Sequence, residues 1–183
     1  MNLRKLEKTE HEKTRRLWEE IFTEDTEAFL DYYYSIKTAE NEIFVMEEDQ
    51  TIRSMLQLNP YRLRVNKASF STNYIIAVAT DEKYRKRGLM GRLLKHAMRE
   101  MYDRKEPFTF LMPAAEAIYY PYDFRFVYNQ GQCEVSGREK KEETLKIVLA
   151  DEKDCVKLAE FANQFLEDEQ VVAVRDEKYY RTV

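Results

Sequence analysis

The chain has 183 residues, of which 44% are hydrophobic and 35% charged, a length and balance typical of one globular domain with part of a second. Its 30 basic and 34 acidic residues give a net charge of -4, which argues against non-specific binding to nucleic acid. The two cysteines lack CxxC spacing, no apolar run is long enough to span a membrane, and the first residues lack a secretory apolar core. We therefore expect a cytoplasmic protein with no disulfide framework, no metal site and no membrane partner.

The first third of the chain changes from a helical to a strand-like hydrophobic period. In chain order, the spacing predicts a strand at 2–6, helices at 11–22 and 26–34, and strands at 42–46, 51–58 and 61–65. Thr26 is placed to cap the second helix. The acidic residues 47–50 predict the turn of a hairpin between the first two of these later strands.

Residues 74–80 form a nearly continuous apolar, β-branched run, which is typical of a strand buried on both faces at the centre of a sheet. A basic loop at 81–88 and a strongly amphipathic helix at 89–101 follow. The remaining predicted elements are a strand at 107–112, a short helix at 114–122, strands at 125–128, 132–135 and 145–149, and a helix at 151–166 capped by Asp151.

The basic loop has the composition of an anion-binding site. The chain has only four glycines, and Gly88 and Gly91 both lie beside the cluster Arg85, Lys86 and Arg87. The first N–H groups of a helix have no internal partner and carry partial positive charge, so they attract a phosphate. The loop matches neither GxxxxGK[ST] nor GxGxxG, which excludes a P-loop and a dinucleotide fingerprint. The alternative is a solvated basic turn with a structural glycine.

The loop resembles the acetyl-coenzyme A motif of the GNAT acetyltransferases, (Arg/Gln)-x-x-Gly-x-(Gly/Ala). Residues 85–91 are Arg-Lys-Arg-Gly-Leu-Met-Gly, with Met90 where a small residue is usual. The resemblance implies an α+β GNAT fold, whose mixed, mostly antiparallel sheet is splayed near Val78 and has helices on both faces. It also implies acetyl-CoA as co-substrate, bound by Val78, Ala79, Thr80, Arg85, Lys86, Arg87, Gly88, Leu89, Met90 and Gly91.

A narrower resemblance is to the N-terminal GNAT domain of Eis-type acetyltransferases. The segments that carry it are residues 57–61, 78–80, 84–90 and 112–119. It implies a GNAT domain at 1–137, a charged linker at 138–143 and the start of a second, incomplete GNAT-like domain at 144–183. It further implies homo-oligomers and a roomy, negatively lined acceptor pocket suited to polyamine-like substrates such as aminoglycosides.

The chemistry implied is N-acetylation of a small or peptidyl primary amine by direct attack on the thioester. In GNAT enzymes backbone N–H groups of the central strand polarise the thioester carbonyl, which here points to Val78. A phenol then protonates the leaving thiolate. Tyr119 is the acid candidate, followed by Tyr122, because Phe124 stands where Eis-type enzymes use a tyrosine. The alternative role for these tyrosines is packing.

Two further questions stay open from the sequence. Glu116 is the nearest carboxylate that could act as base, although this position also suits a helix N-terminus, while His11 and His96 are expected on the surface. The rival function is a catalytically silent acyl-CoA-binding module, which Phe124 favours. A nucleic-acid-binding regulator is disfavoured, since no second basic stripe or aromatic array accompanies residues 83–87.

Overall fold

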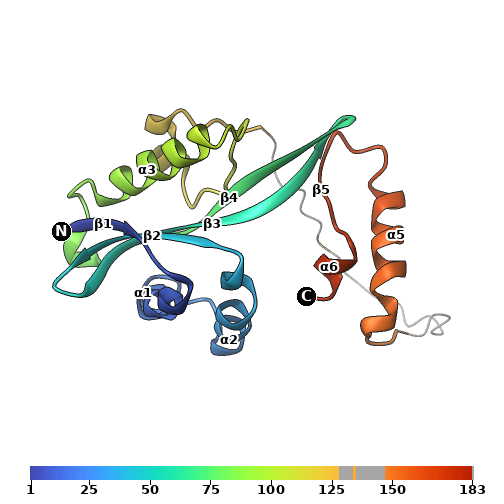
Figure 1. The fold of residues 1–183 in the computed structure, drawn as a ribbon, viewed down its shortest axis with the longest axis horizontal. Coiled ribbons are helices and arrows are strands. Elements are labelled where there is room, and N and C mark those ends of the chain that lie inside the picture. The colour runs from blue at the N-terminus through green and yellow to red at the C-terminus, as the bar shows by residue number, and fades with distance from the viewer. Residues whose placement is uncertain (128–133, 135–146, 183) are drawn as a thin grey trace.

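An antiparallel meander forms the central sheet of the protein (Figure 1). The computed structural model describes residues 1–127, 134 and 147–182. Its strands are β1 (Asn2–Lys5), β2 (Glu42–Glu48), β3 (Thr51–Val65), β4 (Ala68–Thr80) and β5 (Val171–Ala173). The first four lie in the order β1-β2-β3-β4, and β5 pairs with the far end of β3.

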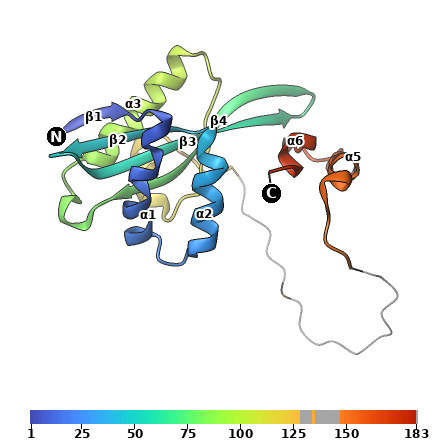
Figure 2. The same ribbon diagram turned by 60° about the horizontal axis from the view of Figure 1, so that its bottom comes forward.

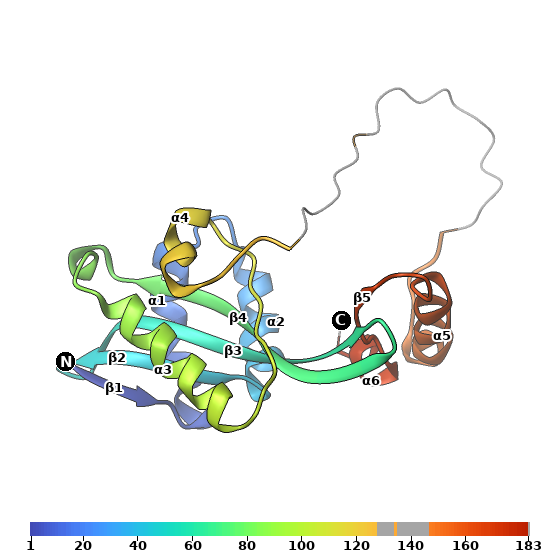
Figure 3. The same ribbon diagram turned by 90° about the horizontal axis from the view of Figure 1, so that it is seen from above.

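The α-helices cover both faces of this sheet. They are α1 (Arg15–Ile21), α2 (Glu27–Ser35), α3 (Leu89–Asp103), α4 (Glu116–Tyr119), α5 (Cys155–Phe165) and α6 (Glu177–Tyr180). Helices α1 and α2 lie on one face and α3 and α4 on the other, as Figures 1 and 3 show from two directions. Two buried clusters result, one centred on Trp18 and Tyr33, the other on Leu93 and Leu94. The fold is therefore the α+β arrangement that the sequence predicts.

Local signals explain where several of these elements begin. The Phe29 N–H donates to Thr26 Oγ1 at 3.2 Å, so Thr26 caps α2 as predicted. Asp151 likewise accepts from the Lys153 N–H at 2.7 Å, at the start of the turn that leads into α5. Asp49 and Gln50 both have positive φ, the two-residue hairpin geometry usually met with Asn-Gly.

Some predicted strands differ in the structure. The two strands predicted at 51–58 and 61–65 are one strand, β3, which continues through Pro60. Proline is tolerated there because β2 pairs with β3 only as far as Leu58. The N–H that Pro60 lacks would therefore have no hydrogen-bond acceptor in β2. The strand predicted at 107–112 is reduced to a single parallel bridge between Phe110 and Tyr74.

Other differences concern the chain after residue 122. Residues 125–127 and 147–149 form no strand, and Ile147 and Leu149 are almost fully exposed. Residues 128, 132–133, 135 and 145–146 lie outside the described part of the chain. None of the helices described is long and apolar enough to cross a membrane.

His11 is buried rather than on the surface as predicted. It lies in a 3-10 turn before α1, and its Nδ1 is 2.9 Å from the Thr38 carbonyl oxygen. Burial lowers its pKa. His96 is partly covered by the ring of Phe44, at a centroid distance of 5.2 Å.

The segment 147–182 docks on the long β3–β4 hairpin, which reaches beyond the helices (Figures 2 and 3). Strand β5 pairs with Leu63, Arg64 and Val65. The Arg64 guanidinium also donates to the carbonyl oxygens of Leu166, Glu169 and Asn66, the last two at 3.2 Å. These hydrogen bonds join α5 and β5 to the hairpin. The linker at 138–143 between two domains stays a prediction.

We expect Arg64→Met to loosen this docking without unfolding the sheet, because the carbonyls lose a charged donor worth about 1–3 kcal/mol. Amide hydrogen exchange at 171–173 should become at least about fivefold faster, while exchange at 43–46 stays unchanged. Lys95→Met, on the exposed side of α3, is the control. Unchanged exchange at 171–173 would show that strand pairing alone holds the segment.

Candidate active site

A bulge interrupts the central strand β4. Met55 pairs with Ala79 and Gln57 with Ile76, so Ala77 and Val78 together lie opposite the single residue Leu56. Ala77 has φ +51°, a backbone conformation rarely adopted by a residue with a side chain. The bulge puts Ile76 and Ala77 in the core beside α1 and α2, and Val78 in the core beside α3.

The outer edge of β4 is open beyond the bulge. The Ile75 N–H donates to the Phe110 carbonyl at 2.9 Å, and past this point β4 has no strand partner on that side among the described residues. The Asp81 N–H donates to Arg53 of β3 at 2.9 Å. Because peptide groups alternate in direction along a strand, Val78 and Thr80 then present their N–H groups to the open edge. An open sheet edge here agrees with the GNAT fold, whose resemblance implies a splay near Val78.

Helix α3 begins beside this opening. Gly88 is its N-cap, with φ +76°, and the first intrahelical bond runs from the Arg92 N–H to the Gly88 carbonyl at 3.1 Å. The N–H groups of Leu89, Met90 and Gly91 therefore precede the helical ladder. A Cβ at Gly88 would meet no atom within 4 Å, so the space beside Gly88, at the start of the helix, is open. The arrangement suits a diphosphate.

The basic side chains of the loop are held by their neighbours. Arg85 Nη1 lies 3.3 Å from Glu82, and its Nε donates to the Thr80 carbonyl at 3.4 Å. The Arg87 guanidinium donates to the Lys83 carbonyl at 2.9 Å. Lys86 takes a positive φ at the tip of the turn. All three are exposed, so their charge is available to a ligand.

Tyr84 fixes the base of the loop. Its ring lies between the guanidiniums of Arg53 and Arg87, each 4.6 Å from the ring centroid. Its hydroxyl donates to Glu48 at 2.8 Å, and this bond raises the pKa of the phenol. Arg53 in turn pairs with Asp81 at 3.1 Å. The loop is thus attached to both strands of the β2–β3 hairpin.

Tyr119, the acid candidate, is buried on the same face as Val78. Both side chains belong to the core beside α3, together with Leu89 and Met90. Burial raises the pKa of Tyr119, so its phenol stays protonated at neutral pH. Phe124 packs edge-on against it at a centroid distance of 5.9 Å. Glu116, by contrast, is exposed at the first residue of α4.

Tyr122 explains the second glycine of the motif. A Cβ at Gly91 would overlap the Tyr122 hydroxyl, so only glycine lets this ring lie on the first turn of α3. The sequence predicts Gly91 as a cofactor residue. Close packing with Tyr122 is the structural reason for a glycine there.

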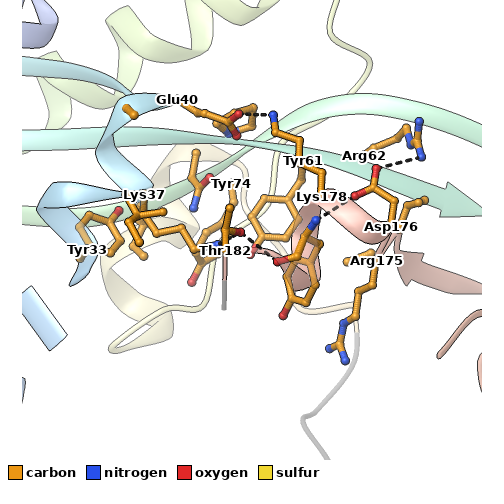
Figure 4. Close-up of a pocket in the computed structure, with 18 of the residues that line it drawn as sticks. Tyr33, Lys37, Glu40, Tyr61, Arg62, Tyr74, Arg175, Asp176, Lys178 and Thr182 are labelled. Carbon is orange, nitrogen blue, oxygen red and sulfur yellow. Dashed lines mark hydrogen bonds and ion pairs between the residues drawn. The ribbon is translucent and has the colours of Figure 1, made fainter. Parts of the chain in front are cut away.

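A cavity of about 590 Å³ opens on the opposite face of the sheet, toward α2 (Figure 4). Its wall includes Tyr74 and Ile76 of β4, the latter next to the bulge. The remaining walls come from α2, β3 and the docked segment after β5, including Tyr33, Tyr61 and Tyr179. It has the size of a small-molecule site.

A buried polar network supports one wall of this cavity. Asn41 Nδ2 donates to the Tyr33 hydroxyl at 2.9 Å and to Gln57 Oε1 at 3.0 Å, and Tyr33 donates to Gln57 at 3.3 Å. Asn41 Oδ1 and Gln57 Nε2 have no partner among the described residues. Burial raises the pKa of Tyr33, so this phenol is a poor base.

The charge around the cavity differs from the negative lining implied by the Eis-type resemblance. Four of the charged lining side chains are basic and two are acidic: Lys37, Arg62, Arg175 and Lys178 against Glu40 and Asp176. Figure 4 shows Lys178 paired with Glu40, and Arg62 with Asp176 at 3.7 Å. This cavity therefore carries excess positive charge.

Sequence reasoning found the loop and the strand but missed this cavity and the bulge. The bulge could not be predicted because the residue with positive φ is Ala77 and not a glycine. The cavity could not be predicted because its lining residues come from segments far apart in the chain. The tyrosines of α2 gave the only signal, and they fitted a helical core stripe equally well.

Comparison with known proteins agrees with this fold. The family model described as Acetyltransferase (GNAT) domain matches residues 2–127. The sequence has no match among curated proteins. The chain belongs to the GNAT acetyltransferase family.

Solved structures share the fold at low sequence identity. A GCN5-related N-acetyltransferase from Ralstonia eutropha is 19% identical, with TM-score 0.61, over 73% of this chain and 97% of that one. A predicted acetyltransferase from Clostridium acetobutylicum, solved with acetyl-CoA, is 12% identical, with TM-score 0.59, over 73% of this chain and 95% of that one. A probable N-acyltransferase from Enterococcus faecalis is 17% identical, with TM-score 0.62, over 66% of this chain and 31% of that one. The aligned part thus spans about a third of the Enterococcus protein.

We expect Gly88→Gln to weaken acetyl-CoA binding by about 100-fold, or roughly 3 kcal/mol, because the side chain enters the open space above the helix N-terminus. Calorimetric titration measures the affinity. Gly88→Ala is the matched control: it carries the same backbone strain but adds only a methyl group. Full affinity in Gly88→Gln would contradict the assignment of the loop.

Gly91→Ala tests the contact with Tyr122. Alanine favours a helix by up to about 1 kcal/mol, but here the methyl group overlaps the phenol oxygen. We expect the substitution to be about 1 kcal/mol more favourable in a Tyr122→Phe background than in the wild type, as measured by urea unfolding in a double-mutant cycle. Equal effects in both backgrounds would exclude the overlap.

Proposed function

We propose that this chain transfers the acetyl group of acetyl-CoA to a primary amine by direct attack. The observation that carries the proposal is the bulge at Ala77 and Val78, which directs the Val78 N–H to an open strand edge beside the N-terminus of α3. One end of this opening suits a diphosphate and the other suits a thioester carbonyl. The cavity on the α2 face is then the entrance for the amine.

Acetyl-CoA binding is assigned to the loop and strand edge together. The N–H groups of Leu89, Met90 and Gly91 receive the diphosphate, with charge added by Arg85, Lys86 and Arg87. The chain between the diphosphate and the sulfur lies along the outer edge of β4. Ala79 and Thr80 border this path: the Thr80 N–H faces the edge, while its hydroxyl is held by β3, 2.8 Å from Ser54 Oγ.

The chemical step needs a stabilised oxyanion and a proton donor. The amine nitrogen attacks the thioester carbon, and the Val78 N–H stabilises the charge that develops on oxygen. The tetrahedral intermediate then collapses, the C–S bond breaks, and Tyr119 donates its proton to the thiolate. The acetylated nitrogen releases its extra proton to water, and the Tyr119 phenolate regains a proton from solvent. The Tyr119 phenol is buried and protonated at neutral pH, so it has a proton to donate.

The amine must be neutral when it attacks. Glu116 does not line the cavity, and Glu40 and Asp176, which do, are each paired with a cation. We therefore assign no side chain as base and propose that the neutral fraction of the amine reacts. The rate should then rise with pH toward the pKa of the amine, about 10.4 for a lysine-like group.

The experiment is calorimetric titration with acetyl-CoA, followed by measurement of free thiol released in the presence of an amine panel. Binding with release of thiol supports the acetyltransferase. Binding without turnover supports the rival, a silent acyl-CoA-binding module, for which the packing of Phe124 on Tyr119 is the favouring observation. No binding by a folded chain would reject both.

Finer features of the function stay proposals. They are an Eis-type relationship, a small-molecule or peptidyl acceptor, a homo-oligomer, a cytoplasmic location and no nucleic-acid partner. The similar segments at 57–61 and 112–119 support the Eis-type proposal. The charge of the cavity argues against its aminoglycoside-like acceptors.

Tyr119→Phe should lower kcat by about 100-fold or more if the phenol protonates the thiolate. Because burial raises its pKa above 10, the acid form persists across the neutral and mildly alkaline range, and wild-type kcat should not fall before about pH 10. Tyr120→Phe, at the exposed neighbouring tyrosine, is the control. Unchanged kcat in Tyr119→Phe would assign this residue to packing.

A further inference from the structure

The amine acceptor has to approach the bulge from the α2 face. The cavity reaches Ile76, next to the bulge, and Tyr74, at the point where β4 leaves Phe110. The opposite face of the sheet at this position is filled by α3, Tyr119 and Val78. The electrostatics of the cavity therefore act directly on the acceptor.

The positive charge of the cavity is not balanced by its own carboxylates. Glu40 is paired with Lys178, and Asp176 with Arg62. Two lining cations, Lys37 and Arg175, form no ion pair within the described part of the chain. A polycationic acceptor would meet this excess charge unfavourably, whereas an anionic group would neutralise it.

Lys37 is the better placed of these two cations. It is half-buried in the 3-10 turn just after α2, while Arg175 is exposed. Its ammonium lies 5.5 Å from the ring centroid of Tyr179 and 6.0 Å from that of Tyr32. Its one hydrogen bond among the described residues is to Thr182 Oγ1 at 3.4 Å, so two of its three donors remain for a ligand.

From these observations we propose that the acceptor is a small amine that also carries a carboxylate, and that Lys37 binds this carboxylate. The inference rests on the proposed acetyl transfer, and it specifies the substrate class of the same site. A cavity of about 590 Å³ is large enough for such a molecule but not for a folded protein. Arg175, 5.6 Å from the same Tyr179 ring, adds charge at the rim.

The test compares amino carboxylates with their uncharged amides. Glycine, β-alanine, 4-aminobutyrate and 6-aminohexanoate, their amides, and spermidine are each incubated with acetyl-CoA and the full chain, and the released thiol is measured. At least one carboxylate should have a kcat/KM 10-fold or more above that of its amide and of spermidine. Preference for the amides or for spermidine overturns the proposal.

Lys37→Gln identifies the residue responsible. It should lower kcat/KM for the preferred carboxylate at least 10-fold, mainly through KM, and leave the amide within twofold. Lys95→Gln, on the exposed side of α3, should change neither. A carboxylate preference that survives Lys37→Gln overturns the assignment.

A binding measurement separates this inference from the proposed function. The N-acetylated carboxylates and amides are titrated into the protein saturated with CoA, which needs no turnover. Tighter binding of a carboxylate, lost in Lys37→Gln, supports the inference even if every amine of the panel is unreactive. Equal or absent binding of both series overturns it, while absent turnover alone counts against the acetyl transfer.

Discussion

The site depends on one extra residue in β4. Ala77 and Val78 both lie opposite Leu56. Because of this extra residue, each side chain after Ala77 points to the opposite face of the sheet from the one it would meet in a regular strand. It brings Ile76 and Ala77 to the α2 face and Val78 to the α3 face. Without the bulge, the direction of the Val78 N–H and the separation of the two cores on either side of it would both change.

The two faces of the sheet therefore contribute different groups to the site. The face beside α3 supplies the N–H groups of Leu89, Met90 and Gly91, which precede the helical ladder, and the buried phenol of Tyr119. The other face supplies the cavity, with Lys37 half-buried at its wall. The strand edge between the two faces has no strand partner past Phe110 within the described part of the chain.

The sequence predicts the parts of this site whose signals are local. The amphipathic spacing of α3, the basic loop and the apolar run of β4 each lie within one short segment, so the loop and the fold class could be predicted. The bulge could not, because an alanine with positive φ is favoured only by its tertiary surroundings. The burial of His11 and the charge of the cavity likewise depend on residues distant in sequence, such as Thr38 and Arg175.

The contacts that Tyr84 makes with two arginines and a glutamate have a consequence for the thermodynamics of ligand binding. Its ring contacts the guanidiniums of Arg87 and Arg53, and its hydroxyl is anchored on Glu48 of the sheet. Freezing a long side chain on binding costs about 0.5–1.5 kcal/mol. A guanidinium already immobilised before the ligand arrives avoids part of that loss. The loop is therefore preorganised, and an anionic ligand bound there should meet a smaller entropic penalty than a free arginine cluster would impose.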